Sequence, residues 1–303
     1  MTPPRTILTL LAFTVALPTL AQSNQVQITV EDDYRYIRAN GIPDHPTGQF
    51  PSRANPNAIA PQEYAFRVPA NPRPAKKLIP VGLQPFGIAV NGVPFDPGAN
   101  EFWGRDPEFL WQFEAKGPAV DLGIDLNNGH VQPGGAYHYH AMPWALVQRL
   151  NPGYGMVLLG YAADGFPIYT PYGHEKPNDA RSRLVKVRSS YRLREGTREN
   201  GPGGLFDGSF VQDYEYVNGA GDLDGANGRF GVTPEFPNGI YHYFITEEFP
   251  FIPRFYRGEP DVSFERRGPP PGTPEDDYVG PPRRGGPPPP PGAPPPRRRP
   301  PPR

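Results

Sequence analysis

Three of the six histidines in this chain lie within eleven residues of one another. His138 and His140 alternate with tyrosines in the run GGAYHYHAMP, residues 134–143, and His130 precedes them by eight residues. Neighbouring residues of a β-strand point to opposite faces, so we expect His138 and His140 to share one face and the tyrosines the other. Three neutral imidazoles that converge form a ligand set for Zn²⁺ or Cu²⁺, with a fourth position open to water or substrate. We therefore predict a metal site at these three histidines.

Two further residues are candidates for the same site. His45, in NGIPDHPTG, is a candidate fourth ligand because of its residue type and the neighbouring Asp44. Asp164, in ADGFPIY, is a candidate second-shell carboxylate that orients an imidazole, or a general base that acts on metal-bound water. Turn chemistry explains Asp164 equally well.

Two other interpretations of the histidines stay open. Paired histidines on an aromatic-rich strand can lie on a sheet surface, each satisfied by one hydrogen bond, while the tyrosines fill the core. A catalytic histidine that acts without metal is the other. Either interpretation would leave the chain without a metal centre.

An internal duplication supplies a comparison. GIAVNGVPFDP (87–97) and GYAADGFPIYTP (160–171) share one pattern, and so do DLNNGHVQPGGAYHYH (125–140) and DLDGANGRFGVTPEFPNGIYHYF (222–244). The order of these elements is the same in both halves, which indicates two copies of one structural unit, with an insertion in the second between Tyr172 and Asp222. The initial Asp-Leu, the Asn-Gly and the Gly-x-Tyr-His-Tyr align the second pair.

The second copy lacks two of the three histidines. Arg229 stands where the first copy has His130, and Phe244 where it has His140, whereas His242 keeps the place of His138. Packing residues would have no particular reason to change together. The joint change favours a site that the first copy alone carries.

The elements that must position these residues are short strands. The chain has 46 Pro, 35 Gly and no Cys, which favours turns and strands over long helices. Alternating polar and apolar residues predict strands in 25–39, 64–68, 182–193 and 240–246, and only 107–113 and 144–150 suit short helices. We expect a mainly β fold: a single pseudo-duplicated domain over 24–262, sandwich- or barrel-like, with repeat units at about 85–143 and 158–250.

The two ends of the chain differ from the domain. Residues 1–21 carry one early positive charge, an apolar run from Ile7 to Leu17 and small residues before a cleavage point, as a secretory signal peptide does. Residues 268–303 are rich in Pro and Arg with almost nothing apolar to bury, which predicts a disordered tail. We expect a periplasmic or extracellular protein without a transmembrane segment.

Charge and missing motifs narrow the function. The tail has a net charge of +3 and residues 22–267 one of −5, so nucleic acid is an unsuitable partner for the domain. The tail could attach to an anionic envelope surface or present a proline-rich ligand to a protein, although such runs are commonly solvated without a partner. The chain lacks the GxSxG, HExxH and phosphate-binding glycine motifs of familiar hydrolases and nucleotide enzymes.

The motifs resemble the YHYH-domain family of bacterial secreted proteins, named for the tetrapeptide at Tyr137–His140. The similarity extends from about Asn40 to near Gly258 and includes NGIPDHPTGQFP, GIAVNGVPFDPG, NGHVQPGGAYHYH, ADGFPIYTPYG and NGRFGVTPEFP. The resemblance implies a secreted protein and carries no established reaction, substrate or cofactor. Similar proteins often have Cys before the second Asn-Gly, where this chain has Gly225-Ala226, so a disulfide or redox role there is lost.

Three classes of function follow from these features. The first is a secreted protein that binds a divalent metal, Zn or Cu, in the first repeat. The second is a metal-free binding or structural module for envelope glycans, with aromatic residues as the contact surface. The third is a metal-dependent hydrolase, and whether the protein is an enzyme is left open by the sequence.

Overall fold

The computed structural model describes residues 23–105, 111–153 and 155–266. The predicted signal peptide, 1–21, and the predicted tail, 268–303, lie outside these residues, as does most of the segment 107–113. The chain is mainly β, as predicted, and its one α-helix among the described residues, α1 (Trp144–Leu150), is one of the two short helices expected. No described helix has the length and apolar character needed to cross a membrane.

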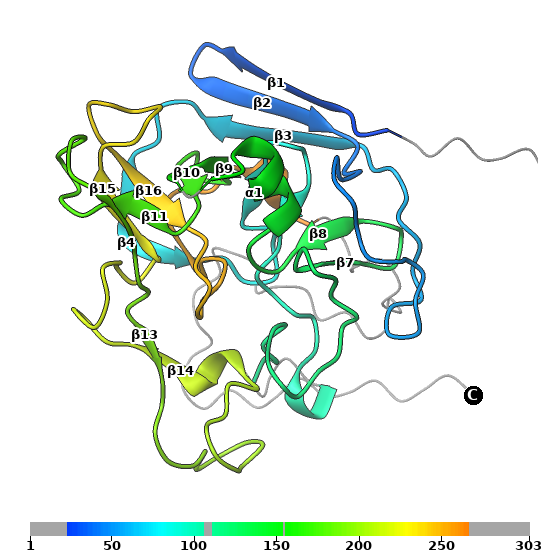
Figure 1. Ribbon diagram of the computed structural model, residues 1–303. Coiled ribbons are helices and arrows are strands. Elements are labelled where there is room, and N and C mark those ends of the chain that lie inside the picture. The colour runs from blue at the N-terminus through cyan, green and yellow to red at the C-terminus, as the bar shows by residue number, and fades with distance from the viewer. Residues whose placement is uncertain (1–22, 106–110, 154, 267–303) are drawn as a thin grey trace, which may run out of the picture.

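An eight-stranded sheet forms the centre of the fold, in the order β15-β16-β10-β9-β5-β6-β8-β7. The first repeat supplies β5 (Gly87–Ala89), β6 (Pro94–Phe95), β7 (Gly129–Val131) and β8 (Tyr137–Tyr139). The second supplies β9 (Leu158–Ala162), β10 (Pro167–Tyr169), β15 (Gly228–Gly231) and β16 (Ile240–Phe244). Each repeat contributes one half of the sheet, so hairpins β7–β8 and β15–β16 lie at opposite ends (Figure 1).

The register of the sheet repeats the sequence duplication. Phe95 of β6 pairs in parallel with Tyr139 of β8, and Ile168 of β10 pairs in parallel with Tyr243 of β16. The two halves meet at the antiparallel pair β5–β9, with Ile88 opposite Tyr161. Because Ile88 and Tyr161 hold the same place in their repeats, an approximate twofold axis passes through this pair.

The hairpins show where the repeats align. Asp125 and Asp224 each accept hydrogen bonds from the glycine N–H four residues later and from the first tyrosine hydroxyl of the following strand. Asn128 and Asn227 both adopt a φ of 55°. Asp224, and not Asp222, is therefore the partner of Asp125, so the Asp-Leu alignment taken from the sequence was wrong by two residues.

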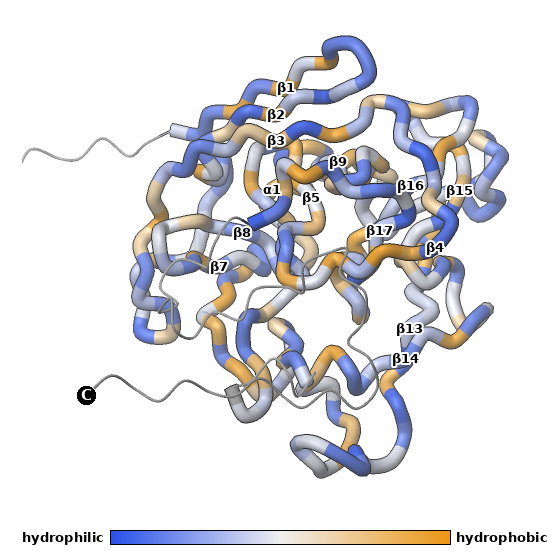
Figure 2. Tube along the Cα trace, turned by 180° about the vertical axis from the view of Figure 1, so that it is seen from behind, coloured by the Kyte–Doolittle hydropathy of each residue, from blue (hydrophilic) through white to orange (hydrophobic). Residues whose placement is uncertain are grey.

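Smaller sheets surround the central one. The strands β1 (Val26–Glu31), β2 (Tyr34–Ala39) and β3 (Tyr64–Pro69) form an antiparallel layer, and β4 (Pro74–Pro80) pairs with β17 (Phe255–Gly258). Figure 2 shows the β1–β3 layer on the opposite side of the molecule from the pair formed by β13 (Tyr191–Leu193) and β14 (Tyr214–Tyr216).

The insertion in the second repeat carries its own elements. These are β11 (Tyr172–His174), β12 (Leu184–Lys186), β13 (Tyr191–Leu193), the 3₁₀ turn η3 (Val211–Asp213) and β14 (Tyr214–Tyr216). Elsewhere in the described residues, 3₁₀ turns occur at η1 (Trp103–Arg105) and η4 (Val262–Phe264).

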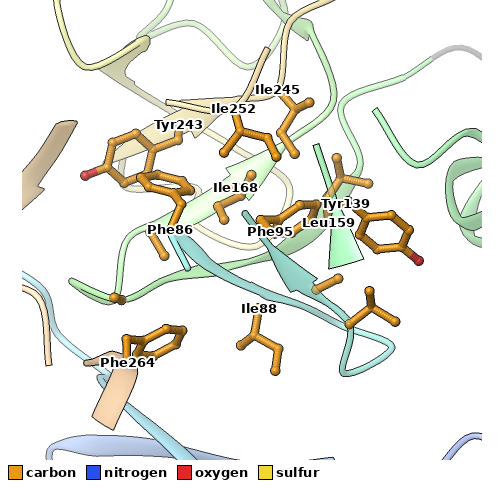
Figure 3. Packing of buried hydrophobic residues seen from close by; sticks show 14 of the residues in the cluster. Phe86, Ile88, Phe95, Tyr139, Leu159, Ile168, Tyr243, Ile245, Ile252 and Phe264 are labelled. Carbon is orange, nitrogen blue, oxygen red and sulfur yellow. The ribbon is translucent and has the colours of Figure 1, made fainter. Parts of the chain in front are cut away.

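The core lies on both faces of the central sheet and contains residues from both repeats: Phe95 and Ile168 are on one face, and Ile88 and Leu159 are on the other. Ile88, Phe95, Leu159 and Ile168 are all at most 1% exposed. Tyr139 and Tyr243 lie at opposite ends of this cluster, with their hydroxyls turned outward (Figure 3). The tyrosines of both Tyr-His-Tyr strands therefore face the core, as the alternation predicted.

The barrel form of the predicted fold is not observed. The central sheet ends at β7 and β15, and these strands do not pair with each other in the described residues. β7 and β15 are therefore the edge strands of an open sheet.

Two equivalent glycines allow the halves to meet. A Cβ added to Gly160 would overlap the Ile88 carbonyl and lie 2.8 Å from Ala89 Cα, and one added to Gly87 would overlap the Tyr161 carbonyl and lie 2.8 Å from Ala162 Cα. We expect Gly160→Ala to lower the free energy of unfolding by at least about 2 kcal/mol, because the β5–β9 backbones must separate. Urea denaturation measures this.

Gly153→Ala is the matched control for this substitution. Its added Cβ would come no closer than 3.4 Å to any atom, at an exposed position, so we expect a change within about 0.5 kcal/mol. Equal stabilities of the two variants would show that the close approach of β5 and β9 does not limit the fold.

Candidate metal centre

The hairpin β7–β8 brings His130, His138 and His140 to one place. His130 pairs directly with His138 across the two antiparallel strands, so their side chains lie on the same face. His140 follows β8 immediately and is two residues from His138, which returns its side chain to that face. Its backbone N–H donates to the Asn128 carbonyl at 2.7 Å, which connects the two sides of the hairpin one residue past the end of β8.

The three Nε2 atoms point at one another. His138 Nε2 lies 3.0 Å from His140 Nε2, which lies 3.1 Å from His130 Nε2. One ligand nitrogen from each ring lies within 4.8 Å of the others, and this group is the one described cluster of at least three histidine, cysteine or acidic side chains close enough to hold a metal. His138 and His140 are 3% and 2% exposed, whereas His130 is half-buried. His130 is therefore the most solvent-accessible of the three histidines.

The outer ring nitrogens fix which nitrogen carries the proton. His130 Nδ1 is 2.8 Å from the Leu122 carbonyl and His138 Nδ1 is 3.2 Å from the Ala136 carbonyl. A carbonyl only accepts, so both Nδ1 atoms are protonated donors and both Nε2 atoms present lone pairs to the centre. His140 Nδ1 is buried and has no hydrogen-bond partner among the described residues.

No arrangement of protons satisfies this cluster. If His140 carries its proton on Nε2, a single N–H is shared between two lone pairs and its buried Nδ1 lacks a donor. If His140 carries the proton on Nδ1, three lone pairs face one another and a buried N–H is unpaired. Each alternative leaves a buried polar atom unsatisfied, which costs about 1–3 kcal/mol. A cation that accepts all three lone pairs removes the repulsion.

Burial keeps the imidazoles neutral. It lowers the pKa of His138 and His140 well below the usual value, and the neighbouring histidines lower both further. The pKa of His130 is also lowered, chiefly by burial. Neutral imidazole is the form that binds metal, so protons compete weakly with a cation at neutral pH.

Asn55 ties a distant segment to the back of this site. It is 4% exposed, and its side-chain amide donates to the Val131 carbonyl at 3.0 Å and to the Leu122 carbonyl at 3.3 Å. Leu122 is the residue whose carbonyl orients His130. Sequence reasoning missed Asn55 because it lies 75 residues before His130, and only the folded chain brings them together.

Two buried ion pairs act electrostatically on the histidine cluster. Asp96 pairs with Arg266, and Glu114 pairs with Arg254 at 2.5 Å; both carboxylates are at most 2% exposed. The positive charges of the two arginines contribute to the low pKa of His140. No sequence pattern indicates these pairs, since the partners are 170 and 140 residues apart.

His45 lies on the opposite face of β8 and is not one of the clustered histidines. Its Nε2 is 2.6 Å from the Tyr139 hydroxyl, and its ring stacks on Tyr139 with centroids 5.8 Å apart. Tyr139 lies between His138 and His140, so the strand itself separates His45 from their Nε2 atoms. The proposal of His45 as a fourth ligand was wrong for this reason.

Asp164 also lies elsewhere. Its carboxylate accepts a hydrogen bond of 2.5 Å from the Tyr243 hydroxyl and others from the N–H groups of Gly258 and Phe166, all in the second half of the chain. No described histidine of the cluster bonds to it. Its equivalent in the first repeat is Asn91, which donates to the Tyr139 hydroxyl at 2.9 Å. Asp164 therefore anchors a core tyrosine and does not orient a ligand.

The second repeat keeps the scaffold of the site with different side chains. Arg229 pairs with His242 across β15–β16, as His130 pairs with His138. The Arg229 guanidinium carbon lies 5.5 Å from the centre of the Phe244 ring, and its Nη2 donates to the His174 carbonyl. His242 Nδ1 donates to the Ile240 carbonyl, as His138 does to Ala136, and its Nε2 is buried without a partner among the described residues.

Comparison with known proteins gives one match. The family described as "YHYH protein" matches residues 65–258, which is well over half of the chain and includes both repeats. No curated protein and no solved structure matches the chain.

Asp164 gives the protein a testable pH dependence. Burial raises its pKa from the usual 3.8 to about 6, so the folded state holds this proton more tightly than the unfolded state. The resulting stabilisation is present below about pH 4 and is lost as the pH rises through 6. We expect Asp164→Asn, which copies Asn91, to remove this loss.

The measurement is the free energy of unfolding at several pH values from 4 to 7. Asp33→Asn replaces an exposed carboxyl and is expected to keep the wild-type slope. Parallel curves for wild type and Asp164→Asn would refute the assignment.

Proposed function

We propose that this chain, which belongs to the YHYH protein family, binds a divalent transition metal ion, zinc or copper, through Nε2 of His130, His138 and His140. The observation that carries the proposal is the convergence of the three Nε2 atoms while the Nδ1 atoms of His130 and His138 donate to backbone carbonyls. A ring held in this way presents its lone pair at a fixed point, which is how metal-ligating histidines are oriented in proteins.

The donor set selects the metal. Calcium and magnesium take oxygen ligands, whereas imidazole nitrogen suits zinc and copper. Tetrahedral Zn–N bonds of about 2.0–2.1 Å separate neighbouring nitrogens by roughly 3.4 Å. The observed separations of 3.0 and 3.1 Å reach this value with small rotations of the rings.

A fourth ligand position, for water or substrate, would lie beside His130, the half-buried member of the three histidines. Three protein nitrogens and one open position are the arrangement of catalytic zinc sites, in which the metal makes bound water acidic. Metal-dependent hydrolysis is for this reason the second candidate function. It predicts hydrolytic activity that disappears with chelation and returns with zinc, and activity unaffected by chelation would contradict it.

The setting of this function is part of the proposal. The signal-like sequence of residues 1–21 supports action in the periplasm or outside the cell. The Arg/Pro-rich residues 268–303 would then be available to an anionic envelope surface.

Removing two histidines tests the site directly. We expect purified wild-type protein, loaded with zinc and then desalted, to retain about one equivalent, and the His138→Ala/His140→Ala double variant to retain only traces. His242→Ala is the matched control, because it removes a buried histidine from the same Tyr-His-Tyr setting in the other repeat and leaves the cluster intact. Elemental analysis measures the metal content. Equal traces in all three proteins would refute metal binding, and circular dichroism checks that each variant is folded.

The second repeat allows a gain-of-function test. Arg229→His together with Phe244→His would place three histidines on β15–β16 in the register of β7–β8. We expect the zinc content to rise from about one to about two equivalents per chain. Phe244→His alone is the control, since Arg229 then still occupies the third position. No increase in the double variant would show that the hairpin register alone does not build the site.

A further inference from the structure

A pocket of about 390 Å³ lies beside the hairpin β15–β16, in the repeat that lacks the histidine cluster. This hairpin is at one end of the central sheet, and β7–β8 is at the other end. The lining of the pocket combines exposed rings, acidic and amide groups and arginines, among them Tyr216, Asn218, Asp222, Asp224, Phe230 and Arg257.

Two aromatic rings border this pocket and remain accessible. Phe230 is 57% exposed and Tyr216 is 39% exposed. Large exposed aromatic side chains leave apolar area in contact with water, so a ligand that covers them gains free energy. Because Phe230 and Tyr241 are paired across the two strands, their side chains lie on one face of the hairpin.

In the first repeat, another segment of the chain covers the equivalent face of the hairpin. Val131 holds the place of Phe230 there and is only 1% exposed, because the segment 45–60 crosses that hairpin. Within the segment, the Gly48 N–H donates to Asp125 Oδ2 at 2.8 Å, and the Phe50 ring packs edge-on against Tyr137 at 6.0 Å. The chain itself thus supplies one hydrogen-bond donor and one apolar surface.

In the second repeat Phe230 stays exposed, and the side chains against Tyr241 are Phe166, edge-on at 5.2 Å, and Arg257, whose guanidinium carbon is 5.9 Å from the ring centre. Asp224, the equivalent of Asp125, accepts only from its own hairpin, namely from Ala226, Gly228 and Tyr241. Burial raises the pKa of Asp224, while these hydrogen bonds and the charge of Arg257 act in the opposite direction. A ligand for the pocket must therefore carry a hydrogen-bond donor for Asp224 and an apolar face for the rings.

We propose that this pocket binds a neutral oligosaccharide through stacking on Phe230 and Tyr216 and through hydroxyl donors to Asp222 and Asp224. A pyranose ring has both required features, a C–H face and hydroxyls around its edge. The charges favour a neutral ligand, because two aspartates and two arginines, Arg229 and Arg257, line the pocket together. The site is separate from the proposed metal centre and does not depend on it.

Isothermal titration with four defined hexasaccharides tests this site: chitohexaose, cellohexaose, xylohexaose and maltohexaose. We expect the full chain to bind at least one with a Kd below a few millimolar, and Phe230→Ala and Tyr216→Ala each to weaken binding at least tenfold. Leu126→Ala, which removes a 93% exposed side chain in the first repeat, should bind as wild type does. The His138→Ala/His140→Ala variant should also bind normally, which separates this site from the metal proposal.

Three outcomes would overturn the proposal. One is that none of the four sugars binds the full chain. Another is that binding is unchanged in both aromatic variants. The third is that a peptide with the sequence of residues 44–52, DHPTGQFPS, binds at Phe230 while the sugars do not, because the pocket would then be a peptide groove that copies the first repeat.

Discussion

Hydrogen bonds to the core tyrosines hold the register on which the histidine cluster depends. Tyr137 is tied to Asp125 and Tyr139 to Asn91, so strand β8 cannot shift along its neighbours without breaking buried bonds. A slip of one residue would exchange the two faces of the strand, placing imidazoles in the core and tyrosines at the cluster. The polar partners of the tyrosines on one face therefore determine the geometry of the histidines on the other.

The twofold repeat separates what the scaffold requires from what the site requires. Both repeats keep the carboxylate before the hairpin, the left-handed asparagine and the tyrosine anchor, with Asp164 in one place and Asn91 in the other. The histidine face carries different side chains in the two repeats. On this face the second repeat has Arg229 in the place of His130 and Phe244 in the place of His140, and the Arg229 guanidinium lies over the Phe244 ring. The chain itself thus supplies a cation there. Such a pair has no lone pairs converging on one point and needs no metal.

The sequence predicted the features that depend on neighbours along the chain. Alternation assigned His138 and His140 to one face, and the internal repeat predicted two copies of one structural unit. The sequence patterns wrongly assigned His45 and Asp164 to the metal site. The position of each depends on a hydrogen bond to a tyrosine that is 94 residues away for His45 and 79 residues away for Asp164. Asn55 and the buried pairs of Asp96 and Glu114 were missed for the same reason. Contacts between distant segments leave no periodic pattern to detect.

The histidine cluster also connects separate parts of the fold. His130 is oriented by the Leu122 carbonyl, which Asn55 holds, while His140 is fixed through Asn128. A bound metal would restrain these loops together, and its binding energy would add to the stability of the folded state. Without a metal, the same geometry leaves buried nitrogen atoms unpaired. An unsatisfied cluster of this kind persists only where the surrounding hydrogen bonds over-determine it. Here they come from the loop that contains Leu122 and Asn128 and from Asn55, which lies 67 residues before Leu122.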